Sequence, residues 1–256
     1  MLPAQRIKSI FEDIKANGIR SVSDLSQKYE VSEMTVRRDL KQLEDQGLIM
    51  RTHGGAVPSS FASEEPQFIQ KQVMHEAEKH QIARYAVEQF VRENDIISME
   101  GGTSVASMVA HMAGYQNITV MTHGLHTLVE LQRIATGNTI ISTGGFLRQV
   151  SNTFVGPVAE EHFTTFHANK VFLSATGWTA ERGFTDPNML EIQVKKAMIR
   201  SAKQIIMLID SSKFGVVSLA SFLDAFDVDH IVTDKRIPAD VYAQFSKRDI
   251  TVHIAS

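Results

Sequence analysis

From residue 96 to the end of the chain, short apolar runs alternate with segments of helical periodicity, and this alternation limits the fold more than any other feature. Short apolar runs bounded by turn residues are typical of buried strands. Strands separated by helices form crossover units, so we predict a doubly wound, mostly parallel α/β sheet. The predicted strands are 96–99, 118–121, 139–142, 170–174, 205–209, 230–232 and 250–254. The predicted helices are 104–112, 125–134, 158–165, 190–201 and 239–246, preceded by a helical stretch at 67–91.

The first part of the chain has a different pattern, in which helical spacing dominates. Ser32 is suited to cap the third of three short helices and Gly47 to end it. Two apolar segments flank Gly54-Gly55, which predicts a small hairpin. Helices followed by a hairpin form a winged helix-turn-helix, expected here at 23–57. The predicted helices are 3–16, 24–29 and 33–46. The predicted divisions are a DNA-binding domain at 1–57, a linker rich in proline and serine at 58–66 and a larger ligand-sensing domain at 67–256.

The third predicted helix has one apolar face and one cationic face. Val36, Leu40 and Leu43 recur at the spacing of a buried stripe. The opposite face suits phosphates and base edges in a DNA groove, and Arg51 and His53 of the hairpin would reach a neighbouring phosphate or the minor groove. The alternative is an ordinary amphipathic helix whose arginines face solvent. The predicted DNA contacts are Ser32, Met34, Thr35, Arg37, Arg38, Lys41, Arg51 and His53.

Composition restricts the classes of function. The 256 residues are 43% hydrophobic and 21% charged and include no cysteine, which excludes disulfides, thiolate catalysis and cysteine-ligated zinc. The formal net charge is −3, so attraction to DNA has to come from a local patch. We find neither an apolar signal segment nor a run of about 18 apolar residues, and therefore expect a cytoplasmic protein without membrane contact.

Polar and cationic residues follow four of the predicted strands. The carboxyl ends of parallel strands meet at one edge of a sheet, where ligands of such folds bind. Glycines and hydroxyls at these turns suit an anion, and Arg148 could clamp a phosphate or carboxylate. Together they predict a site for a small anionic ligand, although each turn alone is also consistent with an ordinary strand end. The four segments are 100–104, 122–124, 143–145 and 210–215.

Two motifs resemble the DeoR family of bacterial sugar-metabolism regulators: Val-Ser-Glu-Met-Thr-Val-Arg-Arg-Asp-Leu at 31–40 and Arg-Thr-His-Gly-Gly-Ala at 51–56. The resemblance implies that Thr35, Arg37 and Arg38 are the core of the DNA contacts. We expect Asp39 to pair within the protein, since a carboxylate repels phosphate. The resemblance extends over nearly the whole chain, through residues 102–103, 118–122, 144–145, 177, 183, 194–198 and 210–215.

The resemblance also implies a fold and a ligand for the larger domain. Sensor domains of the family are related in fold to ribose-5-phosphate isomerase and glucosamine-6-phosphate deaminase. They bind phosphorylated sugars, and binding weakens their hold on operator DNA. Trp178 is expected to cover the pocket or to pack a loop. The predicted effector contacts are Glu100, Gly101, Gly102, Thr103, Ser104, Thr122, His123, Gly144, Gly145, Arg148, Thr176, Trp178 and Lys213.

Three departures from the family pattern concern these contacts. The usual Asp-x-Gly-Thr-Thr is Glu-Gly-Gly-Thr-Ser at 100–104, and the usual Thr-Asn has His123 as its second residue. The usual Asp-Gly-Ile-Asp begins here at Thr176 and ends at Thr179. Two carboxylates are thus replaced by hydroxyls, and an amide by a group able to carry positive charge. We therefore hypothesise an effector with an additional negative charge, such as a phosphorylated sugar acid.

Other readings of the sequence lead to different functions. A sugar-phosphate isomerase or deaminase would use Glu100, Asp210 or Lys213 as acid or base, but an appended DNA-binding domain has no purpose in such an enzyme. An architectural DNA-binding protein would have no effector. His123 and His126 have no third ligand at metal spacing, so no metal or cofactor is expected. One winged helix buries little DNA, so we expect a homo-oligomer, a dimer or tetramer, on repeated half-sites of an operator.

Overall fold

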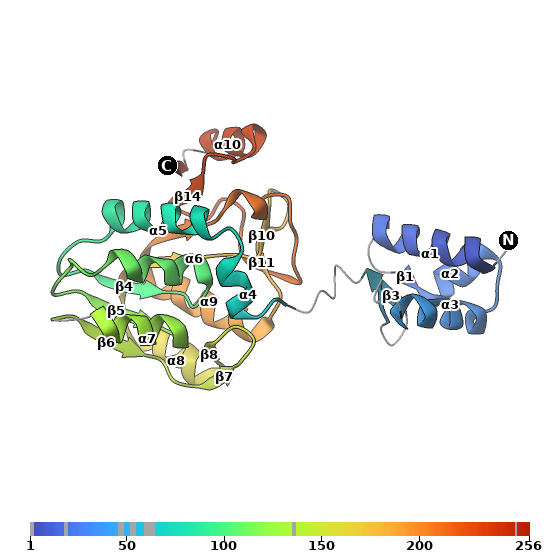
Figure 1. Cartoon of the computed structure of the whole chain (residues 1–256), viewed down its shortest axis with the longest axis horizontal. Helices are drawn as coiled ribbons and strands as arrows, with labels where there is room; N and C mark the ends of the chain where they lie inside the picture. Colours follow the sequence, from blue (N-terminus) through green and yellow to red (C-terminus); the bar gives the residue numbers. More distant parts are fainter. Residues whose placement is uncertain are drawn as a thin grey trace. The chain divides into compact units, whose positions relative to one another are not determined.

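The computed structural model describes residues 3–17, 20–45, 49–51, 55–58, 65–134, 137–248 and 250–256. The chain forms two compact units, Met1–Pro66 and Gln67–Ser256 (Figure 1). Residues 59–64 of the predicted linker lie outside the described part of the chain, as does Gly47, the predicted end of the third helix.

The first unit contains the three predicted helices and the predicted hairpin. Its sheet has the strand order β1-β3-β2 with antiparallel pairing. Helix α2 begins at Val22, two residues before the predicted start, because Ser21 rather than Ser23 caps it. The Ser21 hydroxyl accepts the N–H of Asp24 at 3.0 Å. The elements are α1 (Pro3–Asn17), β1 (Arg20–Ser21), α2 (Val22–Tyr29), α3 (Glu33–Asp45), β2 (Ile49–Arg51) and β3 (Gly55–Pro58).

The predicted apolar stripe of α3 lies in the core of the first unit. Val36, Leu40 and Leu43 are at most 2% exposed. Asp39 is also buried, and its carboxylate pairs with Arg6 of α1 at 2.6 Å from Oδ2 to Nε. The expectation that Asp39 pairs within the protein is confirmed, and this ion pair joins α3 to α1.

All seven predicted strands of the second unit form one parallel sheet, which confirms the doubly wound α/β fold (Figure 1). The strand order is β15-β14-β12-β9-β4-β5-β6. From β4 the chain continues outward through β5 to β6, and then returns to β9 on the other side of β4. The direction of winding therefore switches between β4 and β9. The strands are β4 (Ile96–Met99), β5 (Thr119–Thr122), β6 (Thr139–Ser142), β9 (Ala168–Leu173), β12 (Ala202–Leu208), β14 (His230–Asp234) and β15 (Thr251–Ala255).

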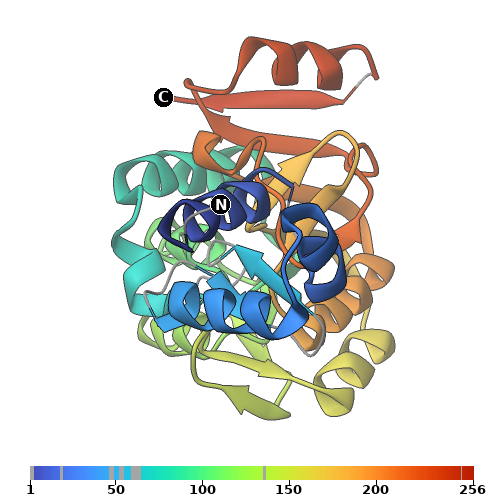
Figure 2. The ribbon, with the colours of Figure 1, turned by 90° about the vertical axis from the view of Figure 1, so that its right-hand side faces the viewer.

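Helices cover both faces of this sheet. In β9, Val171 and Leu173 join the core beneath α8, α9 and α10, while Phe172 joins the core beneath α5, α6 and α7. The inner strands are mostly apolar where both faces are covered. Figure 2 shows β15 and α10 at one end of the sheet. The helices are α5 (Glu76–Phe90), α6 (Thr103–Ala106), α7 (Leu125–Ile134), α8 (Pro157–Thr165), α9 (Met189–Ser201) and α10 (Ala239–Ser246). Among the residues described, no helix is both long and apolar enough to cross a membrane.

Two predicted helices are interrupted. The stretch predicted at 67–91 consists of α4 (Phe68–Val73) and α5, separated where His75 adopts a left-handed backbone with φ of 53°. The helix predicted at 104–112 continues beyond α6 only as a 3₁₀ helix (Ser107–His111). Apolar spacing is similar on both sides of each interruption, so periodicity alone did not reveal either.

The second unit also contains two small antiparallel sheets that the sequence analysis did not predict. One is the β7–β8 hairpin before α8, and the other has the order β10-β11-β13. Their strands are three or four residues long, which is too short for alternation to distinguish them from loops. The strands are β7 (Phe146–Arg148), β8 (Thr153–Val155), β10 (Gly177–Thr179), β11 (Gly183–Asp186) and β13 (Ala220–Leu223).

Replacing Phe172 with alanine should destabilise the second unit by about 3–5 kcal/mol, since the ring is fully buried in the centre of the sheet. Phe146→Ala is the matched control: its ring is 70% exposed, so the change should stay within about 0.5 kcal/mol. Urea unfolding followed by the fluorescence of Trp178 measures both. Equal stability of the two variants would contradict the placement of Phe172.

Candidate functional site

The face of α3 opposite its core stripe is exposed and cationic, as predicted. Met34 is 80% exposed, and Arg38 and Lys41 are also exposed. The guanidinium of Arg37 lies 3.5 Å from the carboxylate of Glu33 in an exposed ion pair. Such pairs contribute about 0–1 kcal/mol, so a DNA phosphate can replace Glu33 as the partner of Arg37.

Ser32 and Thr35 form the first turn of α3. The Ser32 hydroxyl accepts the N–H of Thr35 at 3.3 Å and lies 2.9 Å from the Thr35 hydroxyl. Ser32 therefore caps the helix, as predicted. The cap fixes the start of the helix from which the predicted DNA contacts project.

The β2–β3 pair confirms the predicted hairpin. Arg51 lies in β2 opposite Ala56 of β3. Glycine is required at position 55, because a Cβ there would lie 2.0 Å from the carbonyl oxygen of Arg20, where β3 pairs with β1. His53 and the side chain of Arg51 lie outside the described part of the chain, so their DNA contacts stay predictions.

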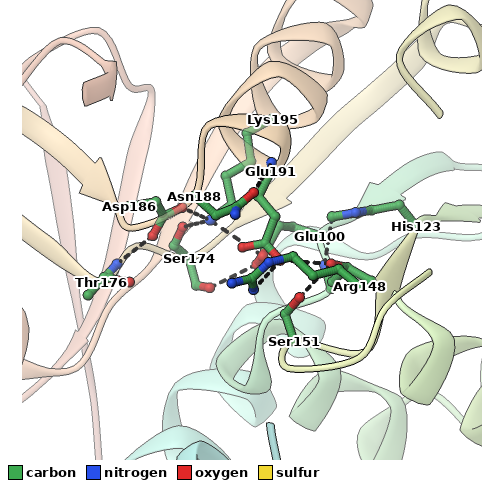
Figure 3. A network of polar contacts seen from close by, with 12 residues as sticks. Glu100, His123, Arg148, Ser151, Ser174, Thr176, Asp186, Asn188, Glu191 and Lys195 are labelled. Atoms are coloured by element: carbon green, nitrogen blue, oxygen red, sulfur yellow. Dashed lines mark hydrogen bonds and ion pairs between the residues drawn. The ribbon is translucent and has the colours of Figure 1, made fainter. Parts of the chain in front are cut away.

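In the second unit, polar side chains meet at the switch point of the sheet (Figure 3). Glu100 directly follows β4 and Ser174 directly follows β9, and these strands are neighbours. The Ser174 hydroxyl donates to Glu100 Oε2 at 2.8 Å. Open α/β sheets bind ligands at this position, outside the carboxyl ends of the strands.

Lys195 of α9 reaches the same point and is 3% exposed. Its ammonium donates to the carbonyl oxygen of Ser174 at 2.7 Å, lies 3.4 Å from Glu100 Oε1 and pairs with Asp186 of β11. Burial lowers the pKa of Lys195, but the charges of Asp186 and Glu100 outweigh burial and raise it above its usual value. Lys195 therefore stays charged and neutralises part of two buried carboxylates.

A second ion pair lies beside the first. Arg148 Nη1 lies 3.4 Å from Glu191 Oε1, which also accepts the Thr153 hydroxyl at 2.7 Å. Thr153 is bonded in turn to the Ser151 hydroxyl at 2.8 Å. Burial raises the pKa of Glu191, but these hydrogen bonds and the nearby cations outweigh burial and lower it. Asn188 caps α9 by accepting the N–H of Glu191 at 3.2 Å, which positions that carboxylate in the first turn.

His123 is completely buried and links two turns of this region. Its Nε2 accepts the N–H of Gly101 at 3.1 Å, and its Nδ1 lies 3.1 Å from the carbonyl oxygen of Phe154. This arrangement requires a neutral ring with the proton on Nδ1. Burial lowers the pKa of His123 below its usual 6.5. The expectation that His123 adds positive charge is therefore wrong, because the imidazole is held neutral by its surroundings.

The two glycines after β4 serve close packing. A Cβ at Gly101 would lie 2.5 Å from a methyl carbon of Thr153, and one at Gly102 would lie 2.4 Å from the hydroxyl oxygen of Ser174. Neither glycine has positive φ in the structure. The absence of a side chain thus lets β4, β8 and β9 converge.

Asp186 places a carboxylate beside one of the hydroxyl substitutions noted in the sequence. Its Oδ1 accepts the N–H of Thr176 at 2.9 Å. In the β10–β11 pairing, Gly177 is opposite Thr185, so Thr176 and Asp186 occupy the next cross-strand position. One of the two carboxylates missing at 176 and 179 is therefore supplied from the neighbouring strand.

The remaining predicted contacts follow the carboxyl ends of parallel strands. Thr103 and Ser104 are buried in α6 after β4, and the Thr122 hydroxyl accepts the N–H of Gly124 at 3.0 Å after β5. Lys213 is half-buried in a 3₁₀ turn after β12. Two glycines with positive φ, Gly144 and Gly145, form the turn after β6. Within the described residues, no group of three His, Asp or Glu side chains could hold a metal ion.

Trp178 packs a loop, the second of the two roles expected for it. The indole is 2% exposed and donates through Nε1 to the carbonyl oxygen of Ala225 at 3.1 Å. Phe184, Phe214 and Phe245 surround it. This enclosure leaves no indole face for an effector, so the geometry does not support Trp178 as a direct contact.

Seven polar residues of the network are missing from the predicted effector contacts: Ser151, Thr153, Ser174, Asp186, Asn188, Glu191 and Lys195. Glu191 and Lys195 lie one helical turn apart on α9, and both are buried. Glu191, Lys195 and Met198 recur at i, i+4 and i+7, the spacing of the buried face of a helix. Two charged residues on such a face indicate a buried polar site, and the sequence alone could have revealed it.

The fold and these two regions define a DNA-binding regulator with a helix-turn-helix unit and an α/β sensor unit. Residues 6–60 match the family model described as a DeoR-like helix-turn-helix domain, and residues 74–235 match the DeoR C terminal sensor domain. The chain belongs to the DeoR family of transcriptional regulators.

Curated relatives match it along their whole length. The HTH-type transcriptional regulator GolR of Listeria innocua is 31% identical over 100% of both chains. The uncharacterized HTH-type transcriptional regulator YulB of Bacillus subtilis is 34% identical over 97% of this chain and 95% of its own, and the HTH-type transcriptional regulator GlpR of Haloferax volcanii is 33% identical over 98% of each. These relatives are transcriptional regulators, and the chain is a regulator rather than an enzyme.

Solved structures resemble parts of the chain more distantly. A ribose 5-phosphate isomerase from Plasmodium falciparum covers 53% of this chain and 52% of its own at 12% identity, with a TM-score of 0.39. Similarity of this extent supports no conclusion about activity.

Arg38→Ala should weaken operator binding by about 1–3 kcal/mol and relax sequence preference, because arginine on a recognition helix contacts base edges bidentately. Lys8→Ala is the control, since Lys8 is an exposed cation on α1 and not on α3. Fluorescence anisotropy with a selected operator and a scrambled duplex measures both. Unchanged operator affinity for Arg38→Ala would contradict the placement of this face on DNA.

His123 should make stability depend on pH. Its pKa is lower in the folded than in the unfolded chain, so the unfolded chain binds more protons and wild-type stability falls as pH drops below about 6.5. His123→Asn removes this titration, and the variant should lose less stability between about pH 8 and about pH 5. Denaturant unfolding at several pH values measures the difference. Parallel profiles for the two proteins would rule out a depressed pKa.

Proposed function

We propose that this regulator represses a carbohydrate catabolic operon and that a small phosphorylated sugar or sugar acid releases it from operator DNA. The main support is the meeting of Glu100, Lys195, Glu191 and Arg148 at the switch point of the sensor sheet, where this fold class binds its ligands. Two relatives are named transcriptional repressors, one of them putatively of an aga operon. Such a protein acts on DNA in the cytoplasm.

The charges of the network favour an anionic effector. Lys195 partly neutralises Glu100 and Asp186, and the side chain of Arg148 is 20% exposed. Arginine binds carboxylates and phosphates bidentately. Thr176 and Thr179 replace two carboxylates of the family pattern and Asp186 supplies only one in return, so repulsion toward a second anionic group is lower. A phosphorylated sugar acid satisfies these conditions better than a neutral-headed sugar phosphate.

Catalysis by the same residues has less support. Glu100, a possible base, is bonded to Ser174 and paired with Lys195, whose charge stabilises the carboxylate and weakens it as a base. Full-length relatives are named regulators. An architectural DNA-binding protein would have no need of a buried network of this kind at the carboxyl edge of its sheet.

Operator recognition requires more surface than one helix provides. A single winged helix buries too little DNA for tight specific binding. We therefore propose that the chain binds as a dimer or tetramer to repeated half-sites.

Matched ligand pairs test the effector class. Glucose 6-phosphate and 6-phosphogluconate differ at C1, as do ribose 5-phosphate and 5-phosphoribonate. The sugar acid of a pair should raise the melting temperature more and should reduce operator binding, and Arg148→Gln should diminish both effects. Stronger stabilisation by the aldose phosphates would reject the sugar-acid preference, and turnover of any of them would favour an enzyme.

A further inference from the structure

Helix α4 is the first element after the predicted linker, and its position depends on contacts with the sensor site. It has six residues (Phe68–Val73), too few for a helix that is stable by itself in water. Its place on the sensor unit is therefore set by the groups that anchor it. Figure 1 shows α4 close to the β7–β8 hairpin, and a hydrogen bond connects the two.

The first anchor is at the start of α4. The N–H of Phe68 donates to the carbonyl oxygen of Val150 at 2.8 Å. This N–H belongs to the first helical residue, where no acceptor exists within the helix. Phe68 is 3% exposed, and its ring packs at a tilt of 46° against that of His126 with 4.8 Å between centroids. The hydrogen bond therefore attaches the start of α4 to the hairpin loop that contains Val150.

The strand that leads into this loop, β7, supplies half of the second ion pair in the candidate site. Arg148 lies two residues before Val150 and is paired with Glu191, and Ser151 follows Val150 directly and is bonded to Thr153. Only Gln149 separates Arg148 from Val150 along the chain. No further element stands between this loop and α4.

The second anchor is at the end of α4. Lys79 of α5 is 4% exposed and donates to the carbonyl oxygen of Lys71 in the last turn of α4. A cation is favourable at a helix C-terminus. Burial lowers the pKa of Lys79 to about 8, and the charges of Asp210 and Lys213 after β12 act on it in opposite directions. Lys79 thus lies near enough to the turn after β12 for the charges of that turn to act on it.

We propose that α4 transmits occupancy of the sensor site to the DNA-binding unit, and that the hydrogen bond from Phe68 to Val150 is the principal link. The proposal rests on the proposed function, since it assigns a route by which an anionic effector alters operator affinity. With Arg148 paired to Glu191, α4 is anchored at both ends. When the effector takes Arg148 as its partner, the loop shifts, the hydrogen bond breaks and the start of α4, which continues the linker, is released.

Hydrogen exchange tests the first half of this route without any effector. Arg148→Gln removes the ion pair with Glu191 as an effector would, and amides at 67–74 in the full-length protein should exchange about tenfold faster. Arg133→Gln is the matched control, because it removes an exposed ion pair with Glu130 on α7. Its exchange at 67–74 should equal that of the wild type. Unchanged exchange at α4 in Arg148→Gln would overturn the proposal.

A double-mutant cycle on an operator selected from random DNA tests the second half. Phe68→Pro removes the N–H donor while suiting the first helical position, and Gln67 before it has the extended backbone that proline requires (φ −57°, ψ 153°). Phe68→Ala removes the ring but keeps the N–H. Arg148→Gln should change operator affinity about tenfold in the wild-type and Phe68→Ala backgrounds and leave it unchanged with Phe68→Pro.

The outcomes distinguish a failure of the proposed role of α4 from a failure of the proposed effector class. Equal effects of Arg148→Gln in the Phe68→Pro and Phe68→Ala backgrounds would show that the hydrogen bond is not the link and would reject the proposal. If both experiments succeed while none of the four phosphorylated probes binds the wild-type protein, the route stands and the proposed effector class fails.

Discussion

The sensor unit depends most on the buried ion pairs that the ammonium of Lys195 forms with the carboxylates of Glu100 and Asp186. These pairs bring together α9, β11 and the turns after β4 and β9. Removing one partner from a buried ion pair costs about 3–5 kcal/mol, because the remaining charge has neither water nor a counter-ion. The three side chains therefore stabilise the network only as a set, and their packing requires glycine at position 102.

The sequence predicts the central sheet well because its inner strands are largely buried and contain short apolar runs. It predicts neither the β7–β8 hairpin nor the β10-β11-β13 sheet, whose short strands show no clear period. The interruption between α4 and α5 depends on the left-handed backbone of His75. Histidine adopts this conformation more often than most residues, but too rarely for the sequence to predict it.

The sequence predicts those residues of the candidate site that follow the strands of the central sheet. Glu100 and Arg148 follow strands of the predicted sheet or lie close after them, so the rule of strand ends locates them. Lys195 and Glu191 come from a helix, and their contact with Glu100 and Arg148 depends on how α9 packs against the sheet. The exposed face of α3 differs because it is formed by neighbouring residues on one helix, so helical spacing alone places it.

The cross-strand position shared by Thr176 and Asp186 has a consequence for how such sensor sites diverge. Side chains at paired positions of antiparallel strands are only about 5 Å apart, so a charged group can change strands while staying at nearly the same point in space. A site can then keep its electrostatic character while two sequence positions both change type. Counting charges at positions 176 and 179 alone would describe this pocket as having lost acidity, whereas the paired position across the hairpin holds the carboxylate of Asp186.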